Sequence, residues 1–219
     1  MAKKNNAPSE RTRAKRLHER AAYDKDTIYG ILDAIPLAHV GYVLDGAPVV
    51  TPTLQWREGN HVYWHGSSAS RMLRKSAGAE VCLTVSALDG FVMARTGFHH
   101  SVNYRSMMMF GTAQLVEDPD EKEARLKAFV EGLFPGRWDI LRPVTAQEIK
   151  ATTVLGMPID EVSAKVRNAP PGDDEEDYAL PIWAGVIPLK THVMPIEHDP
   201  RNLPDVEPPE HIVNFALKS

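Results

Sequence analysis

A glycine- and serine-rich turn followed by an arginine, within residues 63–74, has the composition of a phosphate-binding site. An aromatic run of strand type leads into Gly66, three serines and Arg71. Small residues let the backbone approach an anion, and the free N–H groups at a helix start point toward it. The hydroxyls of Ser67 and Ser70 and the guanidinium of Arg71 would add hydrogen bonds. The pattern predicts a phosphate cradle, and an N-capped surface helix with solvated arginines is the alternative.

Sequence signatures of several other enzyme classes are missing from the chain. It has no G-x-x-x-x-G-K-[ST] loop, no G-x-G-x-x-G after a strand and no G-x-S-x-G turn. A P-loop nucleotidase, a Rossmann dehydrogenase and a hydrolase of the nucleophile-elbow type are therefore disfavoured. The adjacent His99 and His100 point in different directions in any regular element, and His192 and His198 lie in a tail-like region. The acidic run 173–177 is expected to be a solvated loop, so no metal site is predicted.

The composition indicates a globular protein that binds neither nucleic acid nor a membrane. With 43% hydrophobic and 25% charged residues, the chain resembles soluble domains, and its formal net charge of −4 argues against a nucleic-acid binder. No apolar run could span a bilayer, and the basic N-terminus lacks the apolar core of a signal peptide. A cytoplasmic location is expected. The single cysteine, Cys82, lies in an apolar strand-like run and is expected to be a buried strand residue.

The 219 residues are expected to form one domain with two extensions. Residues 1–20 are polar and basic and predict a loosely ordered N-terminal arm whose charges are solvated. Residues 21–190 hold the helical and strand-like patterns and form the predicted domain. Residues 191–219 are polar and rich in proline and are expected to be a tail.

Short strands between two amphipathic helices indicate a mainly β fold. Apolar residues repeat every three or four positions over 28–35 and 126–133, and the second stripe is expected to be core. Between the helices the period becomes strand-like, with turn signals such as Asp45-Gly46 and Asp89-Gly90. Antiparallel strands at such short intervals favour a barrel or a sandwich. The expected strands are 39–44, 49–56, 61–65, 80–87, 91–96, 104–115, 152–166 with an interruption at 156–158, and 183–189.

Four motifs in a fixed order resemble one known family. They are Val50-Thr51-Pro52-Thr53-Leu54, Tyr63-Trp64-His65-Gly66-Ser67, Ser70-Arg71-Met72, and Asn103-Tyr104-Arg105-Ser106 before Phe110-Gly111. The combination resembles the pyridoxamine 5′-phosphate oxidase-related proteins with the FMN-binding split barrel, and among them the branch of the nitroimidazole-resistance proteins. Over about residues 20–190, the resemblance implies a six-stranded antiparallel split β-barrel with flanking helices. It also implies a homodimer with two FMN sites at the subunit interface.

The resemblance also implies where each part of FMN would lie. Residues 52–54 would follow the isoalloxazine edge, His65 and Ser67 would approach the ribityl-phosphate end, and residues 70–72 would grip the phosphate. Residues 105–106 would serve the partner's flavin. A late tryptophan would cover a flavin from the other subunit, with a plain core tryptophan as the alternative. The implied FMN-binding residues are Pro52, Thr53, Leu54, His65, Ser67, Ser70, Arg71, Met72, Arg105, Ser106 and Trp183.

The implied activity is that of an FMN-dependent oxidoreductase that uses NAD(P)H to reduce a small aromatic or nitroaromatic acceptor. The flavin would carry the electrons, so few catalytic side chains are needed. His99, His100 and Tyr104 are the candidates for proton delivery. Vitamin B6 oxidation is not expected. Met72 stands where true pyridoxamine phosphate oxidases have a second basic residue, and the tail from Leu203 lacks their Arg and His motif.

Two alternatives to an FMN-dependent enzyme stay open at the sequence level. A flavin-binding protein without turnover, acting as a cofactor store or a redox sensor, would have the same motifs. The second alternative is a haem-binding relative, with His65, His99 or His100 as the axial ligand. Some members of the family use a deazaflavin, and a fold does not determine its cofactor.

Overall fold

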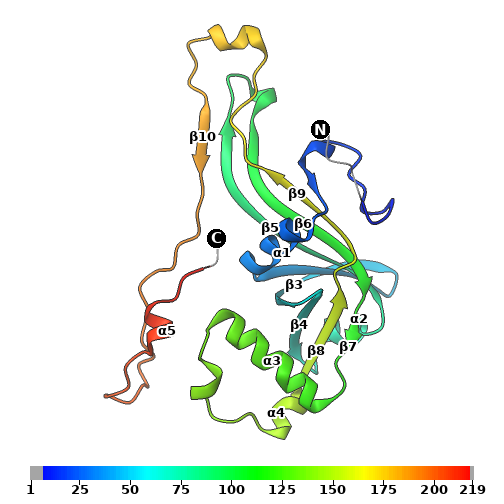
Figure 1. Ribbon diagram of the computed structural model, residues 1–219, viewed down its shortest axis with the longest axis vertical. Coiled ribbons are helices and arrows are strands. Elements are labelled where there is room, and N and C mark those ends of the chain that lie inside the picture. Colours follow the sequence, from blue (N-terminus) through cyan, green and yellow to red (C-terminus); the bar gives the residue numbers. More distant parts are fainter. Residues whose placement is uncertain (1–6, 218–219) are drawn as a thin grey trace.

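One antiparallel sheet dominates the computed structural model, which describes residues 7–217 (Figure 1). Lys3 and Lys4 of the predicted arm lie outside the described residues. The strands follow the order β1-β9-β6-β5-β2-β3-β4-β8-β7, and β10 pairs with β5. The mainly β fold is confirmed, with ten strands in place of six. The strands are β1 (Ala21–Ala22), β2 (Leu37–Leu44), β3 (Ala47–Glu58), β4 (His61–Ser67), β5 (Glu80–Met93), β6 (Ser101–Thr112), β7 (Gln114–Leu115), β8 (Thr152–Pro158), β9 (Glu161–Arg167) and β10 (Gly185–Pro188).

Side-chain caps set where the flanking helices begin. The carboxylates of Asp24 and Asp118 accept hydrogen bonds from the backbone N–H groups of Thr27 and Glu121, at 2.9 and 2.8 Å. Both helices predicted from periodicity are confirmed. The helices are α1 (Lys25–Ala34), α2 (Arg71–Ser76), α3 (Pro119–Leu133), α4 (Ala146–Ala151) and α5 (Glu210–Val213), with 3-10 turns η1 (His18–Arg20), η2 (Gly97–His99), η3 (Trp138–Ile140) and η4 (Glu175–Ala179).

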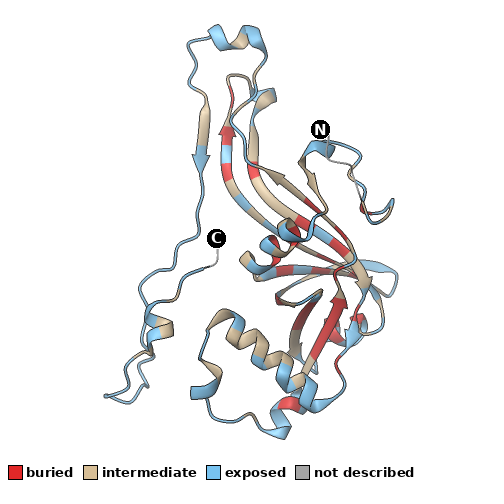
Figure 2. Ribbon diagram, in the orientation of Figure 1, coloured by how far each residue is buried: buried red, intermediate tan, exposed pale blue. Residues whose placement is uncertain are grey.

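The main core lies inside the curled sheet, between its inward face and α1. Alternate residues of the central strands point inward, and Trp64 is fully buried among them. The buried positions follow the strands, whereas the segment after β10 is almost entirely exposed (Figure 2). The core includes Ile28, Ile31, Leu32, Val40, Trp64, Leu83, Val85, Met107, Met109, Leu155 and Met157.

The apolar stripe of α3 packs against a core cluster, as predicted, but this cluster is the smaller of two and is separate from the main core. No residue of α3 is buried. Leu126 and Phe129 are partly buried against a cluster on the other face of the sheet. The buried members of that cluster are Trp56, Tyr63, Val116 and Val154.

The Asp89-Gly90 pair does not form the predicted turn, because β5 runs unbroken through it. The register with β6 shifts between Leu88 and Gly90, which marks a bulge. A Cβ on Gly90 would lie 2.9 Å from the carbonyl oxygen of Ile187 on β10. The glycine is therefore required because a neighbouring strand approaches closely. Sequence alone does not distinguish a glycine with this role from a glycine in a turn.

The predicted strand 152–166 is interrupted later than expected and forms two strands with different neighbours. β8 pairs with β4, whereas β9 pairs with β6. Between them, the backbone N–H of Ile159 donates to the carbonyl of Asn60 at 2.9 Å, and the Asn60 amide donates to Asp160 at 3.0 Å. These bonds fix the crossing that joins the two halves of the sheet.

Both extensions contact the domain. Arg11 pairs with Glu80 and lies 4.7 Å from the ring centroid of Phe110, and Thr12 is only 3% exposed. Residues 7–20 are thus packed against the sheet, where a loosely ordered arm was expected. The C-terminal segment runs down one side of the molecule (Figure 1). The ring centroid of Phe215 lies 5.2 Å from that of Phe134, at the end of α3. No helix in residues 7–217 is long and apolar enough to cross a membrane.

Candidate functional site

The two segments predicted to hold a cofactor lie on either side of the opening where β3 and β4 diverge. The two strands pair from Glu58–His61 to Gln55–Trp64 and then separate. Gln55 fixes the separation, because its buried side chain donates to the carbonyls of Leu32 and Ile35 at 2.7 and 2.9 Å. β3 continues along β2, while β4 runs on toward α2. The opening therefore lies between residues 52–54 and residues 65–71.

The β4–α2 turn has the donors that a phosphate group requires. Backbone bonds hold it in place, since the N–H groups of Ser68 and Ser70 donate to the carbonyls of Ala151 and Ser67, each at 2.8 Å. Ser70 is the N-cap of α2, yet its hydroxyl makes no capping bond and stays available to a ligand. Arg71 is exposed, and no ion pair or hydrogen bond joins its guanidinium to any other residue within 7–217. The Ser67 oxygen accepts a bond from the backbone N–H of Ala69 at 3.2 Å, which leaves its O–H able to donate. The turn thus combines a free cation with hydroxyl donors, as the predicted cradle requires.

Gly66 lets the cradle sit close to the core. A Cβ at this position would lie 3.0 Å from Cδ1 of Leu73 on α2. Because that atom ends a buried side chain, a larger residue would push α2 away from β4. Met72 is 8% exposed and belongs to the core, so its side chain anchors α2 while only its backbone faces the turn.

The opposite side of the opening is apolar. Pro52 and Leu54 of β3 are exposed, and Leu54 is 43% exposed. Thr53 is half-buried, and its hydroxyl donates to the carbonyl of Leu54 at 3.3 Å. An exposed apolar edge next to free phosphate donors suits a ligand with a flat ring at one end and a phosphate at the other.

His65 lies in an aromatic cage on the side of β4 that faces α3. Its ring centroid is 4.8 Å from that of Phe129 and 5.8 Å from that of Trp56. The buried Nδ1 has no hydrogen-bond partner among the described residues. Burial lowers the pKa of His65, which favours the neutral imidazole. The cage holds this ring beside the cradle, whereas Ser67 is exposed on the turn itself.

The predicted proton donors lie at the far end of the hairpin formed by β5 and β6. α2 leads into the start of β5, whereas His99 and His100 follow its end (Figure 1). A strand of 14 residues is about 45 Å long. Tyr104 pairs with Leu88 in the outer half of the same hairpin. Within one chain, these three residues and the phosphate cradle therefore do not meet.

Arg105 and Ser106 have partners on the strands next to β6, which are β5 and β9. The guanidinium of Arg105 makes two bonds to the carboxylate of Asp89, at 3.0 and 3.1 Å, and this pairing raises its pKa. The Ser106 hydroxyl donates to the carbonyl of Lys165 at 3.5 Å. Sequence reasoning missed Asp89 as the partner, since the two residues are 16 positions apart and become neighbours only by strand pairing.

Trp183 is 68% exposed just before β10. The exposure rules out the alternative of a plain core tryptophan. Its ring leans on Gly185, where a Cβ would lie 2.8 Å from Cζ2. The indole face is thus presented outward and is free to contact another molecule.

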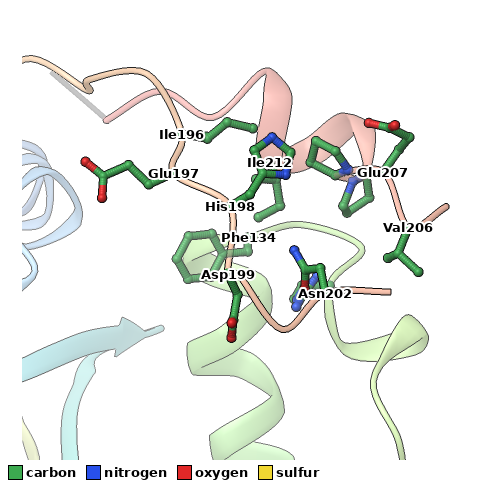
Figure 3. Close-up of a pocket in the computed structure, with 12 residues that line it drawn as sticks. Phe134, Ile196, Glu197, His198, Asp199, Asn202, Val206, Glu207 and Ile212 are labelled. Carbon is green, nitrogen blue, oxygen red and sulfur yellow. The ribbon is translucent and has the colours of Figure 1, made fainter. Parts of the chain in front are cut away.

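A cavity of about 470 Å³ lies between the C-terminal segment and the end of α3, away from the predicted cradle (Figure 3). Phe134 and Ile212 line it, and the ring of His198 stands beside them. The sequence predicted a featureless polar tail here. The apolar residues Ile196, Val206 and Ile212 were the available signal. No group of three or more metal-ligating side chains occurs within residues 7–217.

Comparisons with known proteins agree with the split sheet. The model of the pyridoxamine 5′-phosphate oxidase family matches residues 24–166. The chain belongs to this family. As a member, it has the split-barrel fold that the motifs implied, and it is similar to solved relatives. A search of the curated proteins finds no match.

The similarity to two solved relatives extends beyond the residues that the family model matches. The flavocytochrome Anf3 from Azotobacter vinelandii is 55% identical, with a TM-score of 0.93 over 96% of this chain and 99% of its own. An FAD and haem binding protein from Mycobacterium smegmatis is 36% identical, with a TM-score of 0.86 over 90% of this chain and 97% of its own. A putative 5-nitroimidazole antibiotic resistance protein from Bacteroides thetaiotaomicron is 23% identical, with a TM-score of 0.51 over 67% of this chain and 86% of its own, and shares the fold.

Proposed function

We propose that this protein is a flavocytochrome that binds FAD and haem and passes electrons between them. One observation carries the proposal. The similarity to a flavocytochrome at 55% identity covers 96% of the chain, including most of the segment after residue 166 that the family model leaves out. The haem-binding alternative is thereby favoured over a flavoprotein that holds FMN alone. FMN, expected from the family resemblance, remains an outcome of the test.

The opening between β3 and β4 is the proposed flavin site. Arg71 and the hydroxyls of Ser67 and Ser70 would hold a phosphate, and the exposed edge formed by Pro52 and Leu54 would contact the ring. A bound flavin accepts and releases electrons by itself. The residues of this chain therefore bind and orient the ring and exclude water from it.

A homodimer is part of the proposal, because the outer face of the sheet carries large apolar side chains that the chain's own arm leaves exposed. β2, β3, β5 and β6 have an inward face in the core and an outward face with large exposed side chains. β2 lies between β3 and β5, with Gly41 opposite both Val50 and Cys82, so these side chains form one surface. A second copy of this chain is the proposed cover, as an isologous contact buries the same face twice. The exposed residues include Leu37, Val50, Leu54, Leu88 and Met108.

The dimer would also bring together elements that are distant in one chain. The hairpin tip of one protomer, with Tyr104 and Trp183 near it, could reach the cradle of its partner. We retain the NAD(P)H-linked reduction of a small aromatic or nitroaromatic acceptor as the proposed reaction. Consumption of NADH or NADPH with nitroaromatic and quinone acceptors tests it, and no turnover with any of them would favour a cofactor store or redox sensor.

The absorption spectrum of the purified protein, followed by denaturation and chromatography of the released cofactors, tests the proposal. We expect flavin absorption together with a Soret band, and release of FAD and haem. Release of FMN in place of FAD would overturn the choice of flavin. A yellow protein that neither contains haem nor takes up added haem would overturn the flavocytochrome.

A further inference from the structure

We propose that His100, at the tip of the β5–β6 hairpin, is an axial ligand of the haem iron. This inference rests on the proposed haem binding and names the residue responsible. Nδ1 of His100 lies 2.7 Å from the carbonyl oxygen of Thr96. A carbonyl oxygen only accepts hydrogen bonds, so Nδ1 must donate.

The bond to Thr96 leaves the other ring nitrogen ready to bind a metal. When Nδ1 of a neutral imidazole is protonated, Nε2 has a free lone pair. Histidine ligands of metals typically donate their second ring nitrogen to a carbonyl or a carboxylate, which fixes the tautomer and the ring orientation. His100 is exposed, and its Nε2 has no partner within residues 7–217.

The other two candidate histidines present a metal-binding nitrogen less openly. Nε2 of His99 lies 3.4 Å from the Asp174 carboxylate, which leaves the lone pair on Nδ1, but this contact is longer than the His100 bond and the His99 side chain is only 24% exposed. His65 has its buried Nδ1 unpartnered, and aromatic rings fill the space around it. Of the three, only His100 is an exposed residue, and the bond on its second ring nitrogen is shorter than that of His99.

The tip is also held firmly enough to present a ligand. Asp173 from the loop after β9 accepts hydrogen bonds from the backbone N–H and the guanidinium of Arg95, at 2.8 and 3.0 Å. Its side chain is fully buried, and the Arg95 guanidinium lies 4.7 Å from the ring centroid of Tyr178. Burial opposes ionisation of Asp173, but the bonds from Arg95 outweigh it and lower the pKa. Thr96, whose carbonyl accepts the bond from His100, directly follows Arg95.

Apolar surface next to His100 suits the faces of a porphyrin. Phe98 is 92% exposed and packs only its edge against the ring of His99, at 5.3 Å between centroids. Trp183 lies near the same end of the hairpin, because Gly185 pairs with Met93, and it is 68% exposed. Exposed aromatic rings beside a free imidazole nitrogen provide both the flat contacts and the metal donor that haem requires.

The test compares the full-length holoprotein with His100→Ala, and with His99→Ala as the matched control one residue away. Each is measured for haem per chain, the Soret band and the electron paramagnetic resonance spectrum of the ferric state. We expect His100→Ala to bind haem at least tenfold more weakly or to change its spin state, with added imidazole restoring the wild-type spectrum. His99→Ala should keep the wild-type spectrum.

Two further measurements separate the possible failures. Flavin content and circular dichroism report whether His100→Ala is folded, and His100→Met gives a second variant whose thioether should produce a different ligation spectrum. Wild-type haem content and spectra in both His100 variants would overturn the ligand assignment alone. A wild-type protein that does not bind haem would instead overturn the proposed function.

Discussion

Arg71 is the residue on which the phosphate cradle depends most. Its guanidinium is exposed and has no acidic partner in the described part of the chain, unlike Arg105, which Asp89 holds. We predict that Arg71→Ala weakens flavin binding by about 1.5–3 kcal/mol, which is tenfold or more, because a charge-assisted hydrogen bond is lost. The melting temperature of the flavin-free protein should stay unchanged. Titration of flavin into this variant and into Arg201→Ala, a control on the exposed tail, measures the effect. Equal affinities in both would place the phosphate elsewhere.

His65 predicts a pH dependence of stability. Burial lowers its pKa in the folded state, so below about pH 6.5 the unfolded chain takes up a proton that the folded chain resists. The free energy of unfolding should therefore be fully retained above pH 6.5 and fall as the pH drops toward the lowered value. His65→Phe removes this part of the dependence.

Thermal unfolding from pH 5 to 8 measures this effect. The melting temperature of His65→Phe minus that of wild type should increase as the pH falls below 6.5, and it should be constant above pH 6.5. His192→Phe, on the exposed tail, is the control and should follow wild type throughout. A constant difference between His65→Phe and wild type at all pH values would show that the cage does not oppose protonation.

Residue types were easier to predict than their partners. The hydroxyls and cations of residues 67–71 were recognised from composition, since phosphate binding needs those groups close in sequence. The tautomer of His100 and the pairing of Arg105 depend on residues 4 and 16 positions away, brought close by the hairpin. Met72 was placed at the phosphate by the family resemblance, and its burial in the core depends on how α2 packs against the sheet.

At the scale of elements, Gly90 controls the contact between β5 and β10. We predict that Gly90→Ala destabilises the fold by about 1–3 kcal/mol, because the new Cβ meets a backbone carbonyl 2.9 Å away that cannot move alone. Separation of β10 should also make the segment after it more susceptible to proteolysis. Gly172→Ala, where nothing lies within 4 Å of the added Cβ, is the control.

Urea unfolding and limited proteolysis measure the two effects of Gly90→Ala. Unchanged stability together with unchanged cleavage would mean that β10 is not held against β5 at this glycine. The same glycine explains a limit of the sequence analysis. Asp-Gly is a strong turn signal, and the strand that requires Gly90 lies about a hundred residues later, so only the folded sheet distinguishes a turn from a bulge.

At the scale of the whole molecule, the proposed dimer depends on the outward face of the sheet. We predict a dimer with twice the chain mass of 24.3 kDa, and a monomer for Val50→Glu, since a carboxylate on this face cannot be buried without a partner. Val50 is 64% exposed in one chain, so the variant should fold. Ile140→Glu, at a 58% exposed apolar position outside the sheet, should remain dimeric. Light scattering after size-exclusion chromatography measures the masses, and a dimeric Val50→Glu would place the interface elsewhere.

Sequence motifs identified the family and predicted the flavin cradle, because both depend on local residues in order. The arrangement of the hairpin tip, the arm and the C-terminal segment could not be predicted, since their contacts join residues far apart, such as Arg95 with Asp173 and Phe134 with Phe215. The expectation of FMN followed from the family region alone. The similarity that points to haem extends through the segments outside it.

Anaerobic photoreduction of the flavin in the holoprotein, followed at the Soret band, tests the central claim most directly. A flavocytochrome that passes electrons between its cofactors should show the Soret band shift to its ferrous position as the flavin absorption bleaches. A protein whose flavin bleaches while the Soret band stays in its ferric position, or one that has no Soret band, would contradict the account.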